Sequence, residues 1–171
     1  MYYSWGDPKT GNDVWVLPLA AEAKPFPLLH TPSNEGRTQF SPDGRWVAYS
    51  SDESGRMEIH VIPFHPKGGA PGGKRQVSTA GGNSALWRRD GKELFYIAPD
   101  KTLMAAEAGA KGGTFEACQV RPLFGGLITG SSLYYDVASD GQRFPAVVPP
   151  EQSTNAEPLT VVLNWTAGLK K

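Results

Sequence analysis

The chain has 171 residues, which is enough for one domain with a proper hydrophobic core and too few for two large ones. Its 17 Lys and Arg balance 17 Asp and Glu, so the net charge gives no reason to expect nucleic acid or an anionic membrane surface as a partner. No signal peptide is visible and no apolar stretch approaches the roughly 18 residues of a membrane span, so we expect a soluble protein of unknown compartment.

A recurring Asp-Gly pair marks predicted hairpin turns, and from these turns the strands can be predicted in chain order. The pair occurs as Asp43-Gly44, Asp90-Gly91 and Asp140-Gly141, at spacings of 47 residues (43 to 90) and 50 residues (90 to 140). Asp and Gly tolerate the positive φ of tight turns, so the pair predicts a hairpin wherever it separates two extended runs. A fixed period of this size indicates repeated structural units of four strands, A to D, with the turn joining A to B.

The first two units run over about residues 2–31 and 35–79. Strands B, C and D are expected in the first, and all four strands in the second. Apolar side chains alternate along Arg45–Ser51, which predicts a half-buried strand. The predicted strands are C at Asp13–Leu19 and D at Phe26–Thr31 in the first unit, then B at Arg45–Ser51, C at Glu58–Phe64 and D at Arg75–Thr79 in the second.

The last two units run over about residues 83–124 and 132–166. All four strands are expected in the third unit, and A, B and C in the fourth. The Ala-rich stretch at Met104–Gly113 ends in glycines, so any helix there would be one turn long. The predicted strands are B at Glu93–Ala98, C at Thr102–Glu107 and D at Val120–Phe124, then B at Gln142–Val148 and C at Leu159–Thr166.

Four-stranded units of roughly 40–50 residues are typical of β-propellers. We therefore predict an all-β fold, with residues 1–171 forming a single β-propeller or partial β-propeller domain. It would contain about four blades of antiparallel strands, two complete and two partial.

The sequence also resembles the TolB-like (WD40-like) β-propeller repeat family. The segment "FSPDGRWVAYSSDESGRMEIHVIPF" matches the whole family pattern, and "WRRDGKELFYIAPDKTLMAAE" keeps the Asp-Gly and the strands. The tail "PLTVVLNWTAGLKK" resembles the closing segment of propellers attached to bacterial serine/threonine kinases or transcription regulators. Because the repeated motif is a folding motif, the resemblance implies no catalytic residue. Such propellers usually have six or more blades, so this chain would be a piece of a longer ring.

The Asp-Gly aspartates are expected to be turn formers that accept local backbone hydrogen bonds. Better site candidates lie on the A strands, because the innermost strands of a propeller line its channel. We predict a binding or scaffold module that recognises a protein or small ligand at the channel mouth. The candidate ligand-binding residues are Asn34, Glu35, Arg37, Asn83, Ser84, Tyr134 and Asp136.

The alternative is a Ca²⁺-dependent hydrolase of esters or lactones. Glu35, Asn83 and Asp136 would then hold the ion, because their oxygen atoms suit Ca²⁺. Lactonase-type propellers bind calcium with such residues at the channel, which is an analogy at the level of the fold. A hydrated polar channel without a metal is the simpler reading, so no cofactor is certain.

The remaining candidates favour structural roles. No zinc-binding pattern includes His30, His60 or His65, and the single cysteine, Cys118, excludes an intramolecular disulfide. We expect His60 to be a packing or half-exposed residue and His65 to be exposed to solvent. Unpaired edges at Tyr2–Ser4 and Leu159–Thr166 would be pairing templates, so we expect a homodimer or a larger self-assembly.

Overall fold

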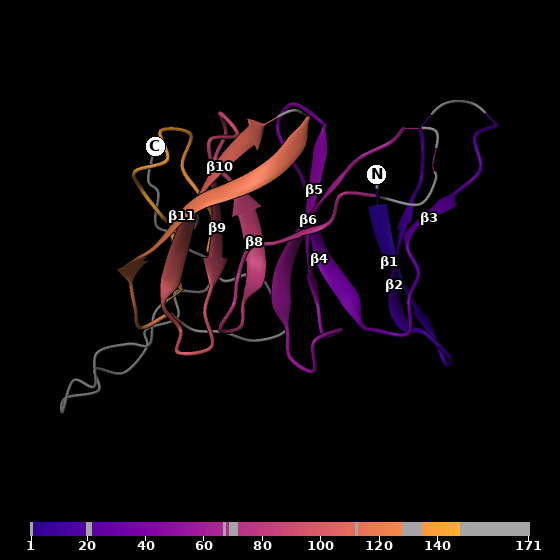
Figure 1. Cartoon of the computed structure of the whole chain (residues 1–171), viewed down its shortest axis with the longest axis horizontal. Helices are drawn as coiled ribbons and strands as arrows, with labels where there is room; N and C mark the ends of the chain where they lie inside the picture. The colour runs from indigo at the N-terminus through magenta and orange to yellow at the C-terminus, as the bar shows by residue number, and fades with distance from the viewer. Residues whose placement is uncertain are drawn as a thin grey trace, which may run out of the picture.

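The computed structural model describes residues 2–19, 22–66, 68, 72–111, 113–127 and 135–147 (Figure 1). These ranges contain three antiparallel sheets, which stand side by side as blades 1 to 3 in Figure 1. Blade 1 contains β1 (Tyr2–Asp7), β2 (Gly11–Val16) and β3 (Phe26–Leu29). Blade 2 contains β4 (Glu35–Phe40), β5 (Trp46–Ser51), β6 (Glu58–Pro63) and β7 (Arg75–Gln76). Blade 3 contains β8 (Asn83–Trp87), β9 (Glu93–Ile97), β10 (Leu103–Lys111) and β11 (Thr114–Phe124).

In every sheet the strands are hydrogen-bonded in chain order, which is the meander of a propeller blade. The prediction of an all-β partial propeller is thereby confirmed. Of blade 4 the described residues show one bridge, between Tyr135 and Ala146. The predicted strand Leu159–Thr166 lies outside the described residues. No helix long and apolar enough to span a membrane occurs within the ranges given above.

The three Asp-Gly turns have the same geometry, as predicted. In each turn the Asp carboxylate accepts a hydrogen bond from the backbone N–H two residues later, and the Gly takes a positive φ. The donors are Arg45 at 3.1 Å from Asp43, Lys92 at 3.0 Å from Asp90 and Gln142 at 3.0 Å from Asp140. The glycine φ angles are 70° at Gly44, 74° at Gly91 and 66° at Gly141. The aspartates therefore act as turn formers.

Strand β5 is buried along its whole length, so the prediction of a half-buried strand is wrong. Its alternate residues face two different neighbours. Val47 and Tyr49 pack in a cluster with blade 1, and Trp46 and Ala48 pack in a cluster with blade 3. Alternating apolar residues are typical of a strand with one buried and one solvated face. Blade 2 is enclosed between two other sheets, so both faces of β5 are buried.

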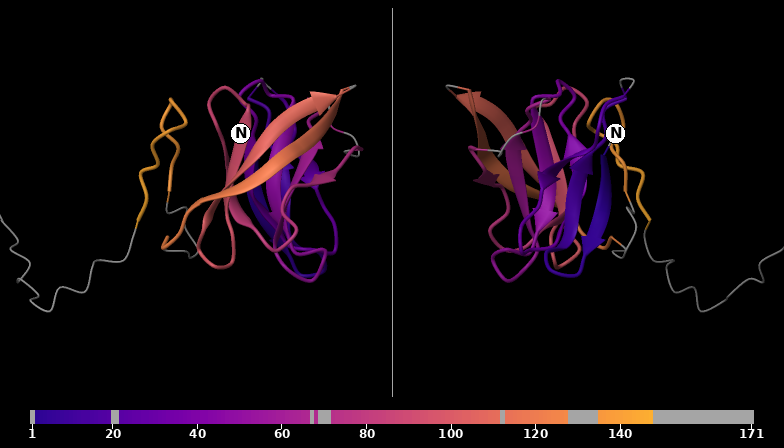
Figure 2. Two further views of the ribbon diagram at one scale, coloured as in Figure 1. Left: turned by 60° about the vertical axis from the view of Figure 1, so that its left-hand side comes forward. Right: turned by 90° about the vertical axis from the view of Figure 1, so that its right-hand side faces the viewer.

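The β10–β11 hairpin is longer than the predicted strands Thr102–Glu107 and Val120–Phe124, and it includes the Ala-rich stretch. It lies obliquely over the neighbouring strands (Figure 2), and β11 contacts β6 and β7 of blade 2. Phe115, near its tip, is 1% exposed. The Phe115 ring centroid lies 5.8 Å from that of Trp46 and 5.9 Å from that of Trp87. This contact between blades stabilises strand structure in a segment whose own sequence is rich in Gly and Ala.

The turn geometry predicts a cost for removing a turn glycine. A Cβ at Gly44 would meet nothing within 4 Å, so Gly44→Ala should cost only the strain of a positive φ, about 1 kcal/mol of unfolding free energy. Gly36 also has open space around it but no positive φ, so Gly36→Ala should change stability by less than about 0.5 kcal/mol. Urea unfolding measures both, and equal effects of the two substitutions would contradict the account.

Candidate functional site

The first strands of blades 2 and 3, β4 and β8, lie next to each other and carry matching β-bulges. The β4–β5 register shifts between Gly36 and Gln39, and the β8–β9 register shifts between Asn83 and Leu86. Within these bulges Arg37 has a φ of 49° and Ser84 a φ of 57°. Positive φ is unfavourable for residues other than Gly, and bulges of this kind concentrate near binding and catalytic sites.

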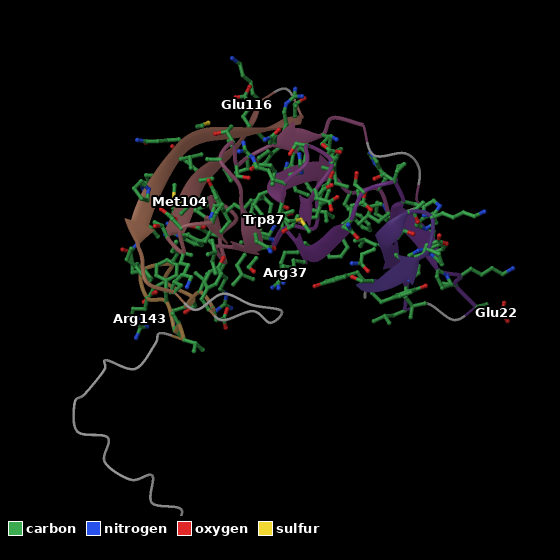
Figure 3. The ribbon with its side chains drawn as sticks, turned by 90° about the horizontal axis from the view of Figure 1, so that it is seen from below. Glu22, Arg37, Trp87, Met104, Glu116 and Arg143 are labelled. Atoms are coloured by element: carbon green, nitrogen blue, oxygen red, sulfur yellow. The ribbon has the colours of Figure 1, made fainter. Side chains whose placement is uncertain are left out.

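The two bulge residues contact each other across the blade interface. Arg37 Nη1 donates to Ser84 Oγ at 3.0 Å, and the Ser84 carbonyl accepts a 2.6 Å bond from the hydroxyl of Tyr135 in blade 4. Asn83 Oδ1 accepts bonds from Ser50 Oγ at 3.0 Å and from the Ser84 backbone N–H at 2.8 Å. We call Arg37, Asn83, Ser84 and Tyr135 the bulge cluster. Figure 3 places Arg37 on the inner side of the arc of blades, away from Glu116 on the outer strand β11.

The structure therefore brings three of the seven predicted site residues together, in the bulge cluster. The prediction missed Tyr135, which is 4% exposed. The predicted Tyr134 lies outside the described residues. The sequence signal for Tyr135 is its position 50 residues after the buried Ala85, which equals the spacing of the last two Asp-Gly turns.

Asn34 connects blades and is not grouped with the bulge cluster. Its side-chain amide donates to Asp52 Oδ2 at 2.7 Å, and its backbone N–H donates to Asp52 Oδ1 at 2.8 Å. Its Oδ1 accepts a 3.3 Å bond from the backbone N–H of Asn12 in blade 1. These bonds tie the start of β2 to the residue that follows β5, which is a structural role.

Glu35 is a buried carboxyl at the junction of blades 1 and 2. It is 3% exposed, the Thr31 hydroxyl donates to its Oε1, and its Oε2 has no hydrogen-bond partner. Burial raises the pKa of Glu35 to about 7, the Thr31 bond opposes this shift, and the nearby Asp13 carboxylate reinforces it. Glu35 is therefore a group that can gain or lose a proton near neutral pH.

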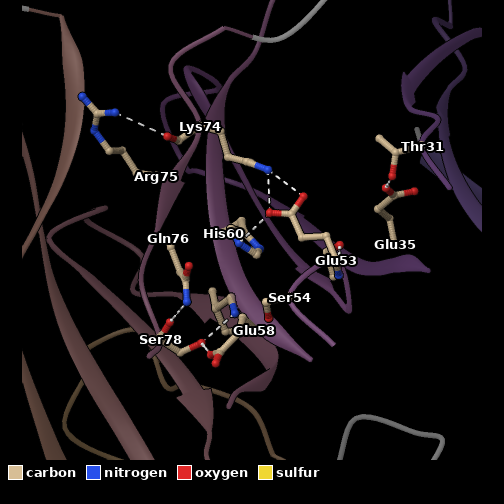
Figure 4. Close-up of polar contacts among 12 residues, drawn as sticks. Thr31, Glu35, Glu53, Ser54, Glu58, His60, Lys74, Arg75, Gln76 and Ser78 are labelled. Carbon is tan, nitrogen blue, oxygen red and sulfur yellow. Dashed lines mark hydrogen bonds and ion pairs between the residues drawn. The ribbon is translucent and has the colours of Figure 1, made fainter. Parts of the chain in front are cut away.

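A cluster of polar side chains lies on blade 2 around Glu53 (Figure 4). Lys74 Nζ lies 2.5 Å from Glu53 Oε1, and His60 Nε2 lies 3.3 Å from the same oxygen. His60 is 1% exposed and stacks on Tyr49 with ring centroids 5.5 Å apart, so the prediction of a packing role is confirmed. Burial lowers the pKa of His60, although the Glu53 carboxylate opposes that shift. His60 is therefore a buried packing residue of blade 2.

Asp13 and Glu58 form a pair of buried carboxylates that the sequence interpretation overlooked. They lie 45 residues apart on the matching strands β2 and β6 and are 1% and 0% exposed. Asp13 Oδ2 accepts from Thr10 Oγ1 at 2.9 Å and lies 2.8 Å from His30 Nδ1. Glu58 accepts bonds from the Ser78 hydroxyl and from the Gly81 backbone N–H. The sequence signal for this pair is that both carboxylates occur at the same position of the repeated strand C.

The three residues predicted as calcium ligands each have other contacts. Glu35 is bound by Thr31, Asn83 is bound within the bulge cluster, and the exposed Asp136 accepts a 2.7 Å bond from the next backbone N–H. Among the described residues, no three or more His, Cys, Asp and Glu side chains lie together in a way that could hold a metal ion. The calcium-dependent hydrolase stays a prediction.

Comparison with known proteins supports the fold. No family model matches the chain. Over 71 residues, 42% of the chain, it is 34% identical to tricorn protease homolog 2 of Streptomyces coelicolor, a match that covers 6% of that protein. A TolB structure from Agrobacterium tumefaciens superposes with a TM-score of 0.51 at 18% identity, over 72% of this chain and 46% of that one. TolB from Acinetobacter baumannii gives a TM-score of 0.46 at 15% identity, over 85% and 45%.

The match to the Agrobacterium tumefaciens structure shows that the chain has the fold of a TolB-type β-propeller, and the chain spans less than half the length of that protein. Attachment to a kinase or to a transcription regulator stays a prediction. At 18% identity the structural match identifies the fold alone.

The buried Glu35 predicts how stability depends on pH. The folded pKa of about 7 exceeds the ordinary 4.5, so between these values the folded state keeps a proton that the unfolded state has released. Relative to Glu35→Gln, the wild-type chain should lose about 1–3 kcal/mol of unfolding free energy between pH 4.5 and pH 7, and little more above pH 7.

Urea unfolding of both proteins at pH 5 and pH 8 measures this difference. The exposed Glu107 offers a matched control, because Glu107→Gln should keep the wild-type pH profile. Parallel profiles for the wild type and Glu35→Gln would contradict the burial argument.

Proposed function

We propose that this chain is a binding module that holds a protein or small ligand against the bulge cluster on the inner side of the blades. The ligand group that fits best is a carboxylate. The planar guanidinium of Arg37, which donates one bond to Ser84 Oγ, matches the geometry of a carboxylate.

The observation that carries the proposal is the backbone of Arg37 and Ser84. Each holds a positive φ at a cost on the order of 1 kcal/mol, which Gly would avoid. A purely structural bulge would favour Gly at both positions. We infer that the chain keeps these two side chains for function despite the cost of their positive φ.

The position of the cluster supports the same proposal. Its members come from three consecutive blades, and hydrogen bonds on Ser84 and Asn83 fix them to one another. A site held by rigid strands needs little ordering when a ligand binds, which favours affinity. The bulge cluster contains one cationic side chain together with amide and hydroxyl groups. It contains no nucleophile with an adjacent base. This composition favours binding over catalysis.

The probes for this proposal are short peptides with a free C-terminal carboxylate, each paired with its C-terminally amidated copy. Free-acid peptides should raise the melting temperature, and amidated copies should not. Arg37→Ala should weaken binding at least tenfold, which corresponds to about 1.4 kcal/mol. Arg37→Lys should weaken it less, because the charge remains without the planar fork.

Arg75→Ala provides the matched control, because Arg75 is exposed on the outer strand β7. It should bind the free-acid peptides as the wild type does. Equal binding by Arg37→Ala and Arg75→Ala, or equal melting shifts from free and amidated peptides, would refute the proposed site.

A further inference from the structure

A cavity of about 210 Å³ lies between blades 2 and 3, beside the Asp-Gly turns of both blades. The oblique β10–β11 hairpin (Figure 2) supplies its remaining wall. Its apolar lining includes Trp46, Trp87, Ala108 and Phe115, and no residue of the bulge cluster lines it. We call this space the interblade cavity.

Ala108 of blade 3 and Phe64 of blade 2 occupy the same position of the repeat. Each donates its backbone N–H to the carbonyl of the residue that follows an Asp-Gly pair. Phe64 donates to Arg45 and Ala108 donates to Lys92, both at 2.8 Å. This identical hydrogen bond establishes the correspondence independently of the sequence spacing.

In blade 2 this position carries an aromatic ring. Phe64 packs edge-to-face on Phe40 of β4, with ring centroids 4.8 Å apart and an interplanar angle of 86°. Trp87 is the blade 3 residue that matches Phe40, because the two occupy the same register opposite Leu94 and Val47. Blade 3 therefore has the methyl group of Ala108 where blade 2 has the phenyl ring of Phe64.

Phe115 of β11 replaces only one contact of that ring. It meets Trp87 edge-to-face, with ring centroids 5.9 Å apart and an interplanar angle of 89°. Phe115 is itself a wall of the interblade cavity, so the space beside Ala108 stays open. An apolar cavity of about 150 Å³ holds one benzene molecule. The interblade cavity therefore has room for one aromatic ring with a short side arm.

Most charges around the interblade cavity are compensated. Arg45 Nε lies 2.6 Å from Asp43 Oδ2, so the blade 2 turn is neutral. The blade 3 turn begins a neutral chain of ion pairs with two acidic and two basic side chains. The chain runs from Asp90 to Arg88 at 3.3 Å, from Arg88 to Glu93 at 2.8 Å, and from Glu93 to Arg121 at 2.6 Å.

Lys92 is the remaining charged residue of the interblade cavity. It is exposed, and among the described residues its ammonium group has no ion-pair partner. The exposed Glu107 precedes Ala108 in β10, but it neither pairs with Lys92 nor lines the interblade cavity. One positive charge is therefore left at the edge of an aromatic cavity, where it complements a single negative charge.

We propose that the interblade cavity binds a small aromatic carboxylate. Its ring would lie beside Ala108, in the position that the ring of Phe64 has in blade 2, and its carboxylate would meet Lys92. Burial of the ring supplies most of the affinity. The exposed lysine selects for the negative charge and contributes less, because water screens its attraction. This site is separate from the bulge cluster and goes beyond the function proposed for it.

A titration of the 171-residue chain with three phenyl compounds of similar shape tests the proposal. The compounds are phenylacetate, the neutral phenylacetamide and the cationic phenethylamine. Amide and indole N–H signals in two-dimensional NMR report both the affinity and the place of binding. Phenylacetate should bind most tightly and phenethylamine most weakly, and each should shift the indole signals of Trp46 and Trp87.

Substitutions at Ala108 test the position of the ring. Ala108→Phe restores the side chain of blade 2 and fills the space, so all three compounds should bind on the order of thirtyfold more weakly. Ala108→Ser is the matched control, because it leaves the space open and should bind as the wild type does.

Substitutions of lysine test the charge without disturbing the packing. Lys92→Gln should weaken phenylacetate binding about threefold and leave phenylacetamide binding unchanged. Lys9→Gln removes the same charge from an exposed turn of blade 1 and should change neither affinity. Because Lys92 is exposed, this arm decides the matter if Ala108→Phe does not fold.

Three results would overturn the proposal. They are no binding of phenylacetate at about 10 mM, equal affinities for the three compounds, and unchanged binding by a folded Ala108→Phe. The proposed function fails separately, because Lys92→Gln should leave peptide binding at the bulge cluster unchanged. Phenylacetate shifts that disappear in Arg37→Ala and persist in Lys92→Gln would assign the compound to the bulge cluster and would also refute this site.

Discussion

The structure depends on the fact that a propeller blade cannot bury its two faces by itself. Every residue of β5 is buried, with Val47 and Tyr49 in the cluster shared with blade 1 and Trp46 and Ala48 in the cluster shared with blade 3. Burial of apolar surface at these interfaces stabilises the packing of the sheets by roughly 25 cal/mol per Å². Stability is then a sum of contributions from each blade and from each contact between neighbouring blades, as in other repeat proteins.

The same constraint produces the polar features of the chain. Stacking brings the first strands of neighbouring blades close together, and the bulges at Arg37 and Ser84 turn polar side chains toward each other at that point. It also buries carboxyls such as Asp13 and Glu35 between blades, where hydroxyl groups supply part of the solvation that water would otherwise give. Burial raises the pKa of Glu35 by more than the Thr31 bond lowers it, and the Oε2 of Glu35 has no hydrogen-bond partner.

Much of the fold could be predicted from the sequence because its signals are local. An Asp-Gly turn between two alternating strands is specified within about a dozen residues. The β10–β11 hairpin was missed because contacts distant in sequence stabilise it, above all Phe115 against Trp46 and Trp87. The same holds for β5, whose second buried face depends on the neighbouring blade.

The candidate site was predicted in part for the same physical reason. Arg37, Asn83 and Ser84 were placed on the inner strands from the repeat alone, but their positive φ angles and mutual contact depend on packing between blades. The prediction selected Tyr134, whereas the residue that bonds to Ser84 is Tyr135. In a strand, a shift of one residue moves a side chain to the other face, and a bulge makes that shift difficult to foresee.

Native-state hydrogen exchange tests most directly whether each blade is stabilised by its neighbours. Amides of β5 and β6, enclosed on both sides, should exchange most slowly, and amides of β1 should exchange fastest. Exchange from β1 that is as slow as from β5 would contradict the account.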